Sequence, residues 1–178
     1  MLEIVVIAVI TLCCLSILWF TLKTGISPMP SSGKVCRCIL KASEQASEGT
    51  IIDLGCGWGG MAFALARKYP DRQVIGYEVS WLPWAWSKLC KSILQLQNLK
   101  LCRLNFLTTE LPEASLLVCY LHPKGMIDLQ KKLSSNRQGV NSLLISSTFA
   151  LPESSPVETI RLKDLYNTPI YIYRLTNR

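Results

Sequence analysis

The residues best suited to chemistry gather in one short stretch, residues 51–60. Two β-branched residues lead into the acid Asp53, and a turn follows with glycines at positions 55, 57, 59 and 60. Glycines let a backbone turn tightly and approach a ligand without Cβ obstruction. A helix that begins directly after such a turn offers free N–H groups and the positive end of its dipole. The stretch therefore predicts a buried strand, a ligand-binding turn and a helix that together hold a nucleotide-type ligand.

Two ligand classes fit this turn. The spacing of Gly55, Gly57 and Gly60 satisfies the G-x-G-x-x-G pattern of dinucleotide-binding folds. Asp53, however, ends the strand two residues before the first glycine, where a carboxylate would crowd a pyrophosphate. The same carboxylate suits a ligand that carries an ammonium or sulfonium charge, which favours S-adenosylmethionine over NAD. A turn that serves structure alone is the other alternative.

The elements around the turn alternate between strand-like and helical patterns. Strands are expected at 51–54, 73–77, 99–104, 115–121 and 140–148, and helices at 60–69, 82–96 and 124–134. Such alternation predicts an α/β, Rossmann-like and mostly parallel sheet with flanking helices. Residues 157–162 and 170–175 are expected to close it as a C-terminal antiparallel pair, and residues 34–46 form a helix before the domain.

In an open parallel sheet, ligands bind beyond the carboxyl ends of the strands. Glu78 follows the second strand, where its carboxylate can accept from both ribose hydroxyls. Asn105 and Phe106 follow the third strand and are candidates for the adenine amine and the adenine face, although Asn105 alternatively serves as a simple turn residue. The full set of predicted cofactor-binding residues is Asp53, Gly55, Cys56, Gly57, Gly59, Glu78, Val79, Asn105 and Phe106.

The fourth strand opens toward the position where a methyl group and its acceptor would meet. Tyr120 and His122 are the polar candidates for catalytic residues there, and His122 is the single histidine of the chain. It can act as a general base near neutral pH, or it can be structural. Three tryptophans, at positions 81, 84 and 86, follow Glu78 and suit a core, the wall of an acceptor site or a membrane interface.

The N-terminus predicts a membrane anchor. Residues 4–22 carry no charge over a length that spans a bilayer, with Glu3 before the run and Lys23 after it. All 19 Lys and Arg residues lie from Lys23 onward, so the positive-inside rule places the following domain on the cytoplasmic side. We therefore expect a single-pass anchor at 1–23, a linker and helix at 24–48, and one domain at 49–178.

The charge and the cysteine content limit which partners and metal sites are expected. The net charge of +7 suits an anionic membrane surface, an acidic partner or nucleic acid, but the cations are scattered, so nucleic acid is not expected. Eight cysteines fall mostly within predicted strands and helices, as small buried hydrophobes in a reducing compartment do. No metal site is expected, because Cys36 and Cys38 have no second close pair and the chain holds one histidine.

The motifs resemble a known class of enzymes. The sequence Asp-Leu-Gly-Cys-Gly-Trp-Gly at 53–59, followed by Gly-Tyr-Glu at 76–78, is similar to the first motifs of class I S-adenosylmethionine-dependent methyltransferases. Over nearly the whole chain, the N-terminal apolar run, residues 27–32, residues 76–79, Pro123 and residues 129–133 resemble the small membrane-anchored protein-lysine methyltransferases of the ATP synthase c-subunit lysine methyltransferase family. Phe149, Leu151 and Pro152 match a late pattern of that family.

The resemblance implies a function, and the chain departs from the family pattern at two positions. It implies a membrane-anchored methyltransferase that modifies a lysine of a membrane-associated protein, with residues 30–32 near the acceptor. Trp58 and Asn105 stand where the family usually has acids. The alternatives are a methyltransferase for a small or lipid-like acceptor and a module that binds the cofactor without turnover.

Overall fold

The computed structural model describes residues 1–178 except for 2, 5, 8–10, 12–31, 136–141 and 176–178. The described helices are α2 (Gly33–Ala42), the short 3-10 helix η1 (Ser43–Gln45), α3 (Gly60–Lys68), α4 (Trp81–Ile93) and α5 (Pro123–Ser135). The described strands are β1 (Ile51–Leu54), β2 (Val74–Tyr77), β3 (Leu99–Cys102), β4 (Leu116–Cys119), β5 (Ser142–Ser147), β6 (Glu158–Arg161) and β7 (Pro169–Leu175).

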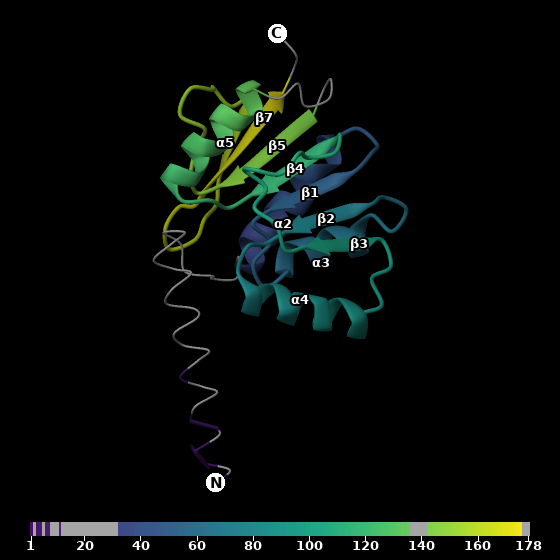
Figure 1. The fold of residues 1–178 in the computed structure, drawn as a ribbon. Helices are drawn as coiled ribbons and strands as arrows, with labels where there is room; N and C mark the ends of the chain where they lie inside the picture. The colour runs from purple at the N-terminus through teal and green to yellow at the C-terminus, as the bar shows by residue number, and fades with distance from the viewer. Residues whose placement is uncertain (2, 5, 8–10, 12–31, 136–141, 176–178) are drawn as a thin grey trace.

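The strands form one mixed sheet in the order β3-β2-β1-β4-β5-β7-β6 (Figure 1). Pairs among β1 to β5 are parallel, whereas β7 runs antiparallel to both β5 and β6. The chain reverses direction across the sheet between β1 and β4, which is the position where open α/β sheets bind ligands. The expected Rossmann-like, mostly parallel sheet with a C-terminal antiparallel pair is therefore confirmed.

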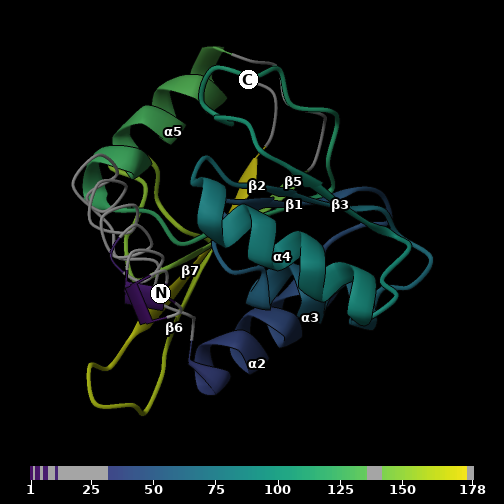
Figure 2. The same ribbon diagram turned by 60° about the horizontal axis from the view of Figure 1, so that its bottom comes forward.

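Helices cover the two faces of the sheet unequally. Figure 2 shows α2, α3 and α4 on one face and α5 on the other. On the first face, Val35 and Ile39 of α2 pack with Leu65 of α3 and with Ile170 and Ile172 of β7. On the second face, α5 supplies Met126 and Leu129, and the connecting segments supply Phe106, Leu111 and Leu151. Loops thus bury part of the sheet that helices do not cover.

Several boundaries differ from the sequence prediction. β3 ends at Cys102 and β4 at Cys119, each two residues earlier than expected, and α4 ends at Ile93 instead of position 96. α4 stops early because Gln95 takes a positive φ of 53°, which a helix cannot continue. α5 begins at Pro123, whose fixed φ and missing N–H suit the first helical position.

The predicted anchor concerns residues that lie largely outside the described part of the chain. Among the described residues, no helix has both the length and the apolar character needed to cross a bilayer. The span at 4–22, the part of the 24–48 segment that precedes residue 32 and the orientation drawn from them stay predictions.

Candidate active site

The glycine turn is fastened to the end of the neighbouring strand. The backbone N–H groups of Gly55 and Cys56 both donate to the carbonyl oxygen of Tyr77, at 3.0 and 2.9 Å. The Gly59 N–H closes the turn by donating to the Cys56 carbonyl at 2.8 Å. The turn is therefore a fixed surface at the carboxyl edge of β1 and β2.

Two glycines of the turn need their lack of a side chain. Gly57 has a φ of +52°, and a Cβ placed there would meet nothing within 4 Å, so the turn faces open space at this point. Gly59 has a φ of +86°, and its Cβ would stand 2.4 Å from the ring of Phe63. Gly59 also precedes the first residue of α3. An open, Cβ-free backbone next to a helix N-terminus can receive a ligand at close range.

Glu78 lies beside this opening and is held by two backbone donors. Its Oε2 accepts the Gly57 N–H at 2.9 Å, and its Oε1 accepts the Ser80 N–H at 2.7 Å. Each carboxylate oxygen retains a further lone pair, so Glu78 can still accept from two vicinal hydroxyls. Its side chain is 9% exposed, which limits competition from water.

Asp53 lies deeper, at 4% exposure, and its Oδ2 is buried without a hydrogen-bond partner. Burial first, and then the negative charge of Glu78, raise the pKa of Asp53 to about 7, against a smaller opposing effect of the Ala62 N–H. An unpartnered buried carboxyl oxygen is costly unless a ligand supplies a donor. A cationic ammonium donor would satisfy this oxygen and favour its charged form, so the residues fit S-adenosylmethionine.

Not every predicted cofactor residue presents its side chain to the opening. The Cys56 side chain packs into the core on Gly76, where an added Cβ would lie 2.9 Å from its Sγ. Burial raises the pKa of the Cys56 thiol well above its usual value, so Cys56 is a packing residue whose backbone shapes the turn. Val79, in contrast, is 37% exposed directly after Glu78 and offers an apolar surface.

Asn105 and Phe106 follow β3, as expected, but both have structural contacts. The Asn105 side-chain oxygen accepts the Leu107 N–H at 3.0 Å, which uses one of its two lone pairs in a turn. Phe106 is 7% exposed and packs with Leu111 and Ala114. Their contacts with adenine stay predictions.

The segment after β4 brings three rings together. Tyr120 and Phe149 stack with centroids 6.4 Å apart, and His122 lies 6.2 Å from Phe149 at a tilt of 52°. Leu121 lies between Tyr120 and His122 in the sequence. Its side chain is 3.4 Å from the position that a Cβ of Gly55 would take. The ring cluster, defined as Tyr120, His122 and Phe149, is thus joined to the glycine turn through Leu121.

Phe149 belongs to the late family pattern but is not among the site residues that the sequence predicts. It follows Thr148, whose φ of +70° is unusual for a β-branched residue. Ser146 Oγ donates to the Phe149 carbonyl at 2.6 Å, and the Thr148 N–H donates to Pro169 of β7 at 2.8 Å. The position of Phe149 therefore depends on the strained backbone at Thr148 and on β7, the C-terminal strand that pairs with β5.

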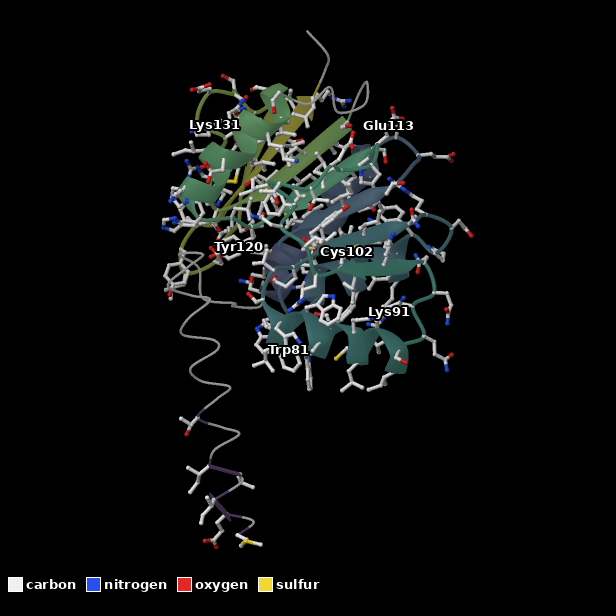
Figure 3. All side chains as sticks on the ribbon, viewed as in Figure 1. Trp81, Lys91, Cys102, Glu113, Tyr120 and Lys131 are labelled. Carbon is white, nitrogen blue, oxygen red and sulfur yellow. The ribbon has the colours of Figure 1, made fainter. Side chains whose placement is uncertain are left out.

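The three tryptophans after Glu78 have different environments. Trp84 packs against the core, and its Nε1 donates to the Leu101 carbonyl at 3.4 Å. Trp81 and Trp86 are 55% and 52% exposed. Figure 3 shows Trp81 at the beginning of α4 and Tyr120 beyond the end of β4.

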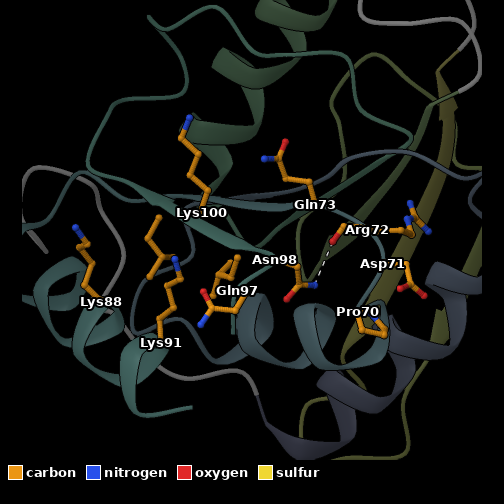
Figure 4. A pocket seen from close by; sticks show the side chains of 11 residues that line it. Pro70, Asp71, Arg72, Gln73, Lys88, Lys91, Gln97, Asn98 and Lys100 are labelled. Carbon is orange, nitrogen blue, oxygen red and sulfur yellow. Dashed lines mark hydrogen bonds between the residues drawn. The ribbon is translucent and has the colours of Figure 1, made fainter. Parts of the chain in front are cut away.

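A surface hollow lies away from this site. It has a volume of about 440 Å³ and is lined mainly by residues 70–73 and 97–101 together with Lys88 and Lys91 (Figure 4). Residues 70–73 and 97–101 precede or begin β2 and β3, at the amino edge of the sheet, and the two lysines belong to α4. Asn98 in its wall donates to the carbonyls of Ala66, Tyr69 and Arg72, which fastens the β2–β3 edge to the end of α3. The convergence of Asp53, Glu78 and the glycine turn locates the cofactor site better than this hollow does.

Comparisons with known proteins give the family of the chain. Residues 53–158 match the family described as the ANTKMT methyltransferase domain. A search of curated protein sequences finds no significant match.

Solved structures share the fold at low identity. An RNA methyltransferase from Salinibacter ruber, in complex with S-adenosyl-L-homocysteine, is similar with a TM-score of 0.70 and 18% identity, covering 84% of this chain and 95% of its own. A SAM-dependent methyltransferase from Aquifex aeolicus has a TM-score of 0.59 and 13% identity, covering 78% and 88%. PKMT2 from Rickettsia typhi, in complex with AdoHcy, has a TM-score of 0.50 and 22% identity, covering 58% and 22%. At these identities the likeness shows the fold, not a shared substrate.

The family match covers more than half of the chain and begins at Asp53. The expectation of a methyltransferase that uses S-adenosylmethionine is confirmed. The chain belongs to the ANTKMT methyltransferase domain family.

Proposed function

We propose that the protein is a membrane-anchored protein-lysine N-methyltransferase whose acceptor is a lysine of a membrane-associated protein, with the domain on the cytoplasmic side. The observation that carries the lysine acceptor is the ring cluster beside the glycine turn. The uncharged run at residues 4–22 supports the anchor. The matched family and the membrane-anchored lysine methyltransferases that the sequence resembles support the reaction.

The ring cluster suits the aliphatic stem and the nitrogen of a lysine. Tyr120 and Phe149 are partly buried and His122 is exposed, so an acceptor side chain can enter from solvent along the rings. Aromatic faces attract cationic nitrogen, including methylated ammonium products. Desolvation acts in the opposite sense on the unmethylated lysine, because an apolar surround lowers its pKa and so increases the fraction of the neutral amine that can attack.

The remaining residues hold the cofactor and align it. When bound, the cofactor supplies a methyl group that is attached to a sulfonium sulfur. The electrons of the S–CH₃ bond stay on sulfur when the methyl group is transferred. In this proposal Asp53 binds the ammonium group of the cofactor, and Glu78 binds its ribose hydroxyls. The open backbone at Gly57 lets the ligand approach the turn closely. Positioning of two reactants accounts for much of the rate in such a displacement.

The reaction balances without a metal or redox partner. The lone pair of the neutral lysine nitrogen forms the N–CH₃ bond while the S–CH₃ bond breaks. The extra proton on the lysine nitrogen is then transferred to water or to His122. The His122 ring is exposed, so it can pass the proton to solvent. The catalytic roles of Tyr120 and His122 are part of this proposal.

The test is transfer of labelled methyl groups. The full chain, in detergent or lipid, is incubated with methyl-labelled S-adenosylmethionine and membrane fractions, and label is followed into protein bands and into the organic extract. We expect label on lysine in a membrane protein band, and its loss with Asp53→Asn. Asp71→Asn, which changes an exposed acid at the opposite edge of the sheet, serves as the matched control.

Label in the organic extract alone would replace the lysine acceptor with a lipid-like one. Label on a soluble protein alone would contradict the membrane-associated acceptor while leaving the reaction intact.

A further inference from the structure

Helix α4 carries an apolar surface that no described part of the chain covers. Trp86, Leu89 and Ile93 recur at helical spacing and are 52%, 55% and 70% exposed. Trp81, at 55% exposure, adds a further ring at the N-terminal end of the helix. Clusters of exposed large hydrophobic side chains on one element mark a surface for a partner or a membrane. We call these four residues the α4 apolar surface.

The α-helices on the face of the sheet that contains this surface carry positive charges and no negative ones. Helices α2, α3 and α4, which lie on the same face of the sheet (Figure 2), contain seven Lys and Arg residues and no acid. One of the seven, Lys68, pairs with Glu44 of η1 at 2.6 Å. On α4 itself, Lys88 is exposed and Lys91 half-exposed, and no acid separates them from the apolar side chains.

Apolar and cationic side chains on one helix match the two layers of an anionic membrane surface. Tryptophan rings favour the headgroup region, aliphatic side chains enter the acyl boundary, and Lys ammonium groups contact anionic headgroups. A soluble protein partner would be expected to offer acids to Lys88 and Lys91 as well, but it would not explain why the whole helix layer lacks acids.

A short segment joins this layer to the predicted anchor. Residues 23–31 separate the uncharged run at 4–22 from the N-cap of α2 at Ser32. Nine residues can extend over roughly 30 Å at most. If the run at 4–22 spans the bilayer, α2 and the layer that it begins are confined to the adjacent surface.

We propose that the α4 apolar surface docks onto an anionic lipid bilayer as a second membrane contact besides the N-terminal segment. The docking rests on the proposed membrane attachment, but not on the identity of the acceptor. Because Trp81 follows Glu78 by three residues, docking holds the cofactor opening close to the lipid headgroups. The acceptor lysine would then be one that lies near the membrane surface.

Photo-crosslinking of the full chain in lipid nanodiscs tests this contact. A benzophenone-bearing phenylalanine replaces Leu89, or, as a matched control, Ile127 of α5, which is 43% exposed on the other face of the sheet. The nanodiscs contain phosphatidylcholine with or without phosphatidylglycerol, and mass spectrometry detects lipid adducts. We expect several-fold more lipid adduct at position 89 than at 127, and a further gain with phosphatidylglycerol. The double substitution Lys88→Glu/Lys91→Glu should remove that gain.

Elution of the chain with the nanodisc separates the possible failures. A chain that does not elute with the nanodisc overturns both the membrane attachment and the docking. A chain that elutes with it but gives equal lipid adducts at 89 and 127 overturns the docking alone. Crosslinks from position 89 to a second copy or to an added protein, without lipid adducts, also overturn it and assign the surface to that partner.

Discussion

Asp53 in β1 and Glu78 directly after the adjacent strand β2 lie close enough for their charges to interact, but only Glu78 has hydrogen-bond donors for both carboxylate oxygens. The Asp53 Oδ2 is buried without a partner, and the charge of Glu78 adds to burial in raising the pKa of Asp53 to about 7. The site thus stores an unfavourable interaction that a bound cation relieves. This relationship leads to three predictions.

The first prediction is that Asp53→Asn stabilises the protein without ligand. The folded-state pKa of about 7 lies above the usual 3.8, so the unfolded chain ionises first and stability from this group falls from about pH 4 to about pH 7. An amide has no such charge to bury. We expect the variant to be more stable by about 1–3 kcal/mol above pH 7, and equal to the parent near pH 4.

Denaturant unfolding of the full chain in mild detergent at several pH values measures this difference. Asp71→Asn should leave the pH profile unchanged, because Asp71 is exposed. A constant difference between Asp53→Asn and the parent at all pH values would show that ionisation of Asp53 is not its cause.

The second prediction concerns the pH dependence of cofactor affinity. Because a cationic ligand favours the ionised form of Asp53, affinity should rise with pH, by up to about tenfold per unit, until pH reaches about 7. Above about pH 8, loss of the ligand's own α-amino proton should reverse the trend. Calorimetric titration with S-adenosylmethionine checks this, and an affinity independent of pH between 5 and 7 would refute the role of Asp53.

The third prediction is that Glu78→Gln weakens the cofactor and loosens the turn together. The glutamine side chain has one neutral acceptor oxygen and an NH2 group, so both Gly57 and Ser80 lose a charged acceptor and one of the two loses its acceptor altogether. Loss of charge-assisted bonds should reduce affinity for S-adenosylmethionine by about tenfold to a hundredfold. Glu113→Gln, which changes an exposed acid before β4, should leave the affinity intact. Equal affinities in the two variants would mean that Glu78 does not bind the ligand.

Most of the cofactor side of the site was predictable from the sequence. The first strand has the expected bounds, 51–54, since two β-branched residues followed by an acid and glycine allow few other structures. Glu78 follows β2 because an apolar run ends there. These signals are local, and the residues lie within one strand-turn-helix unit and the next strand.

The acceptor side depends on contacts that sequence patterns do not carry. Phe149 reaches Tyr120 because Thr148 adopts a positive φ, and glycine or asparagine would have been the expected signal for such a turn. The strand that holds Thr148 in place, β7, comes from the C-terminus and inserts between β5 and β6. Likewise, only the fold shows that Trp84 is packed while Trp81 and Trp86 are exposed.

The fourth prediction separates the acceptor side from the cofactor side. Phe149→Ala removes the ring that contacts both Tyr120 and His122. Aromatic pairs contribute about 0.5–1.5 kcal/mol, so KM for the protein acceptor should rise by about twofold to tenfold. The affinity for S-adenosylmethionine should not change. Steady-state kinetics with Tyr166→Ala as control, a residue that is 82% exposed, decides the point. A loss of cofactor affinity in Phe149→Ala would place the ring in the cofactor site instead.

The fifth prediction concerns the strain that positions Phe149. Thr148 has a φ of +70°, and a β-branched residue in this region costs about 1–3 kcal/mol, which glycine avoids. Glycine gains freedom in the unfolded chain, which offsets about 0.5–1 kcal/mol. Thr148→Gly should therefore raise the free energy of unfolding by about 1 kcal/mol, whereas Thr159→Gly, in the edge strand β6, should lower it by a similar amount. Denaturant titration of both variants compares them, and destabilisation by Thr148→Gly equal to that of Thr159→Gly would show that position 148 is not strained. If the strain is real, the gain in stability should come with weaker acceptor binding, because the backbone before Phe149 is then free to take other conformations.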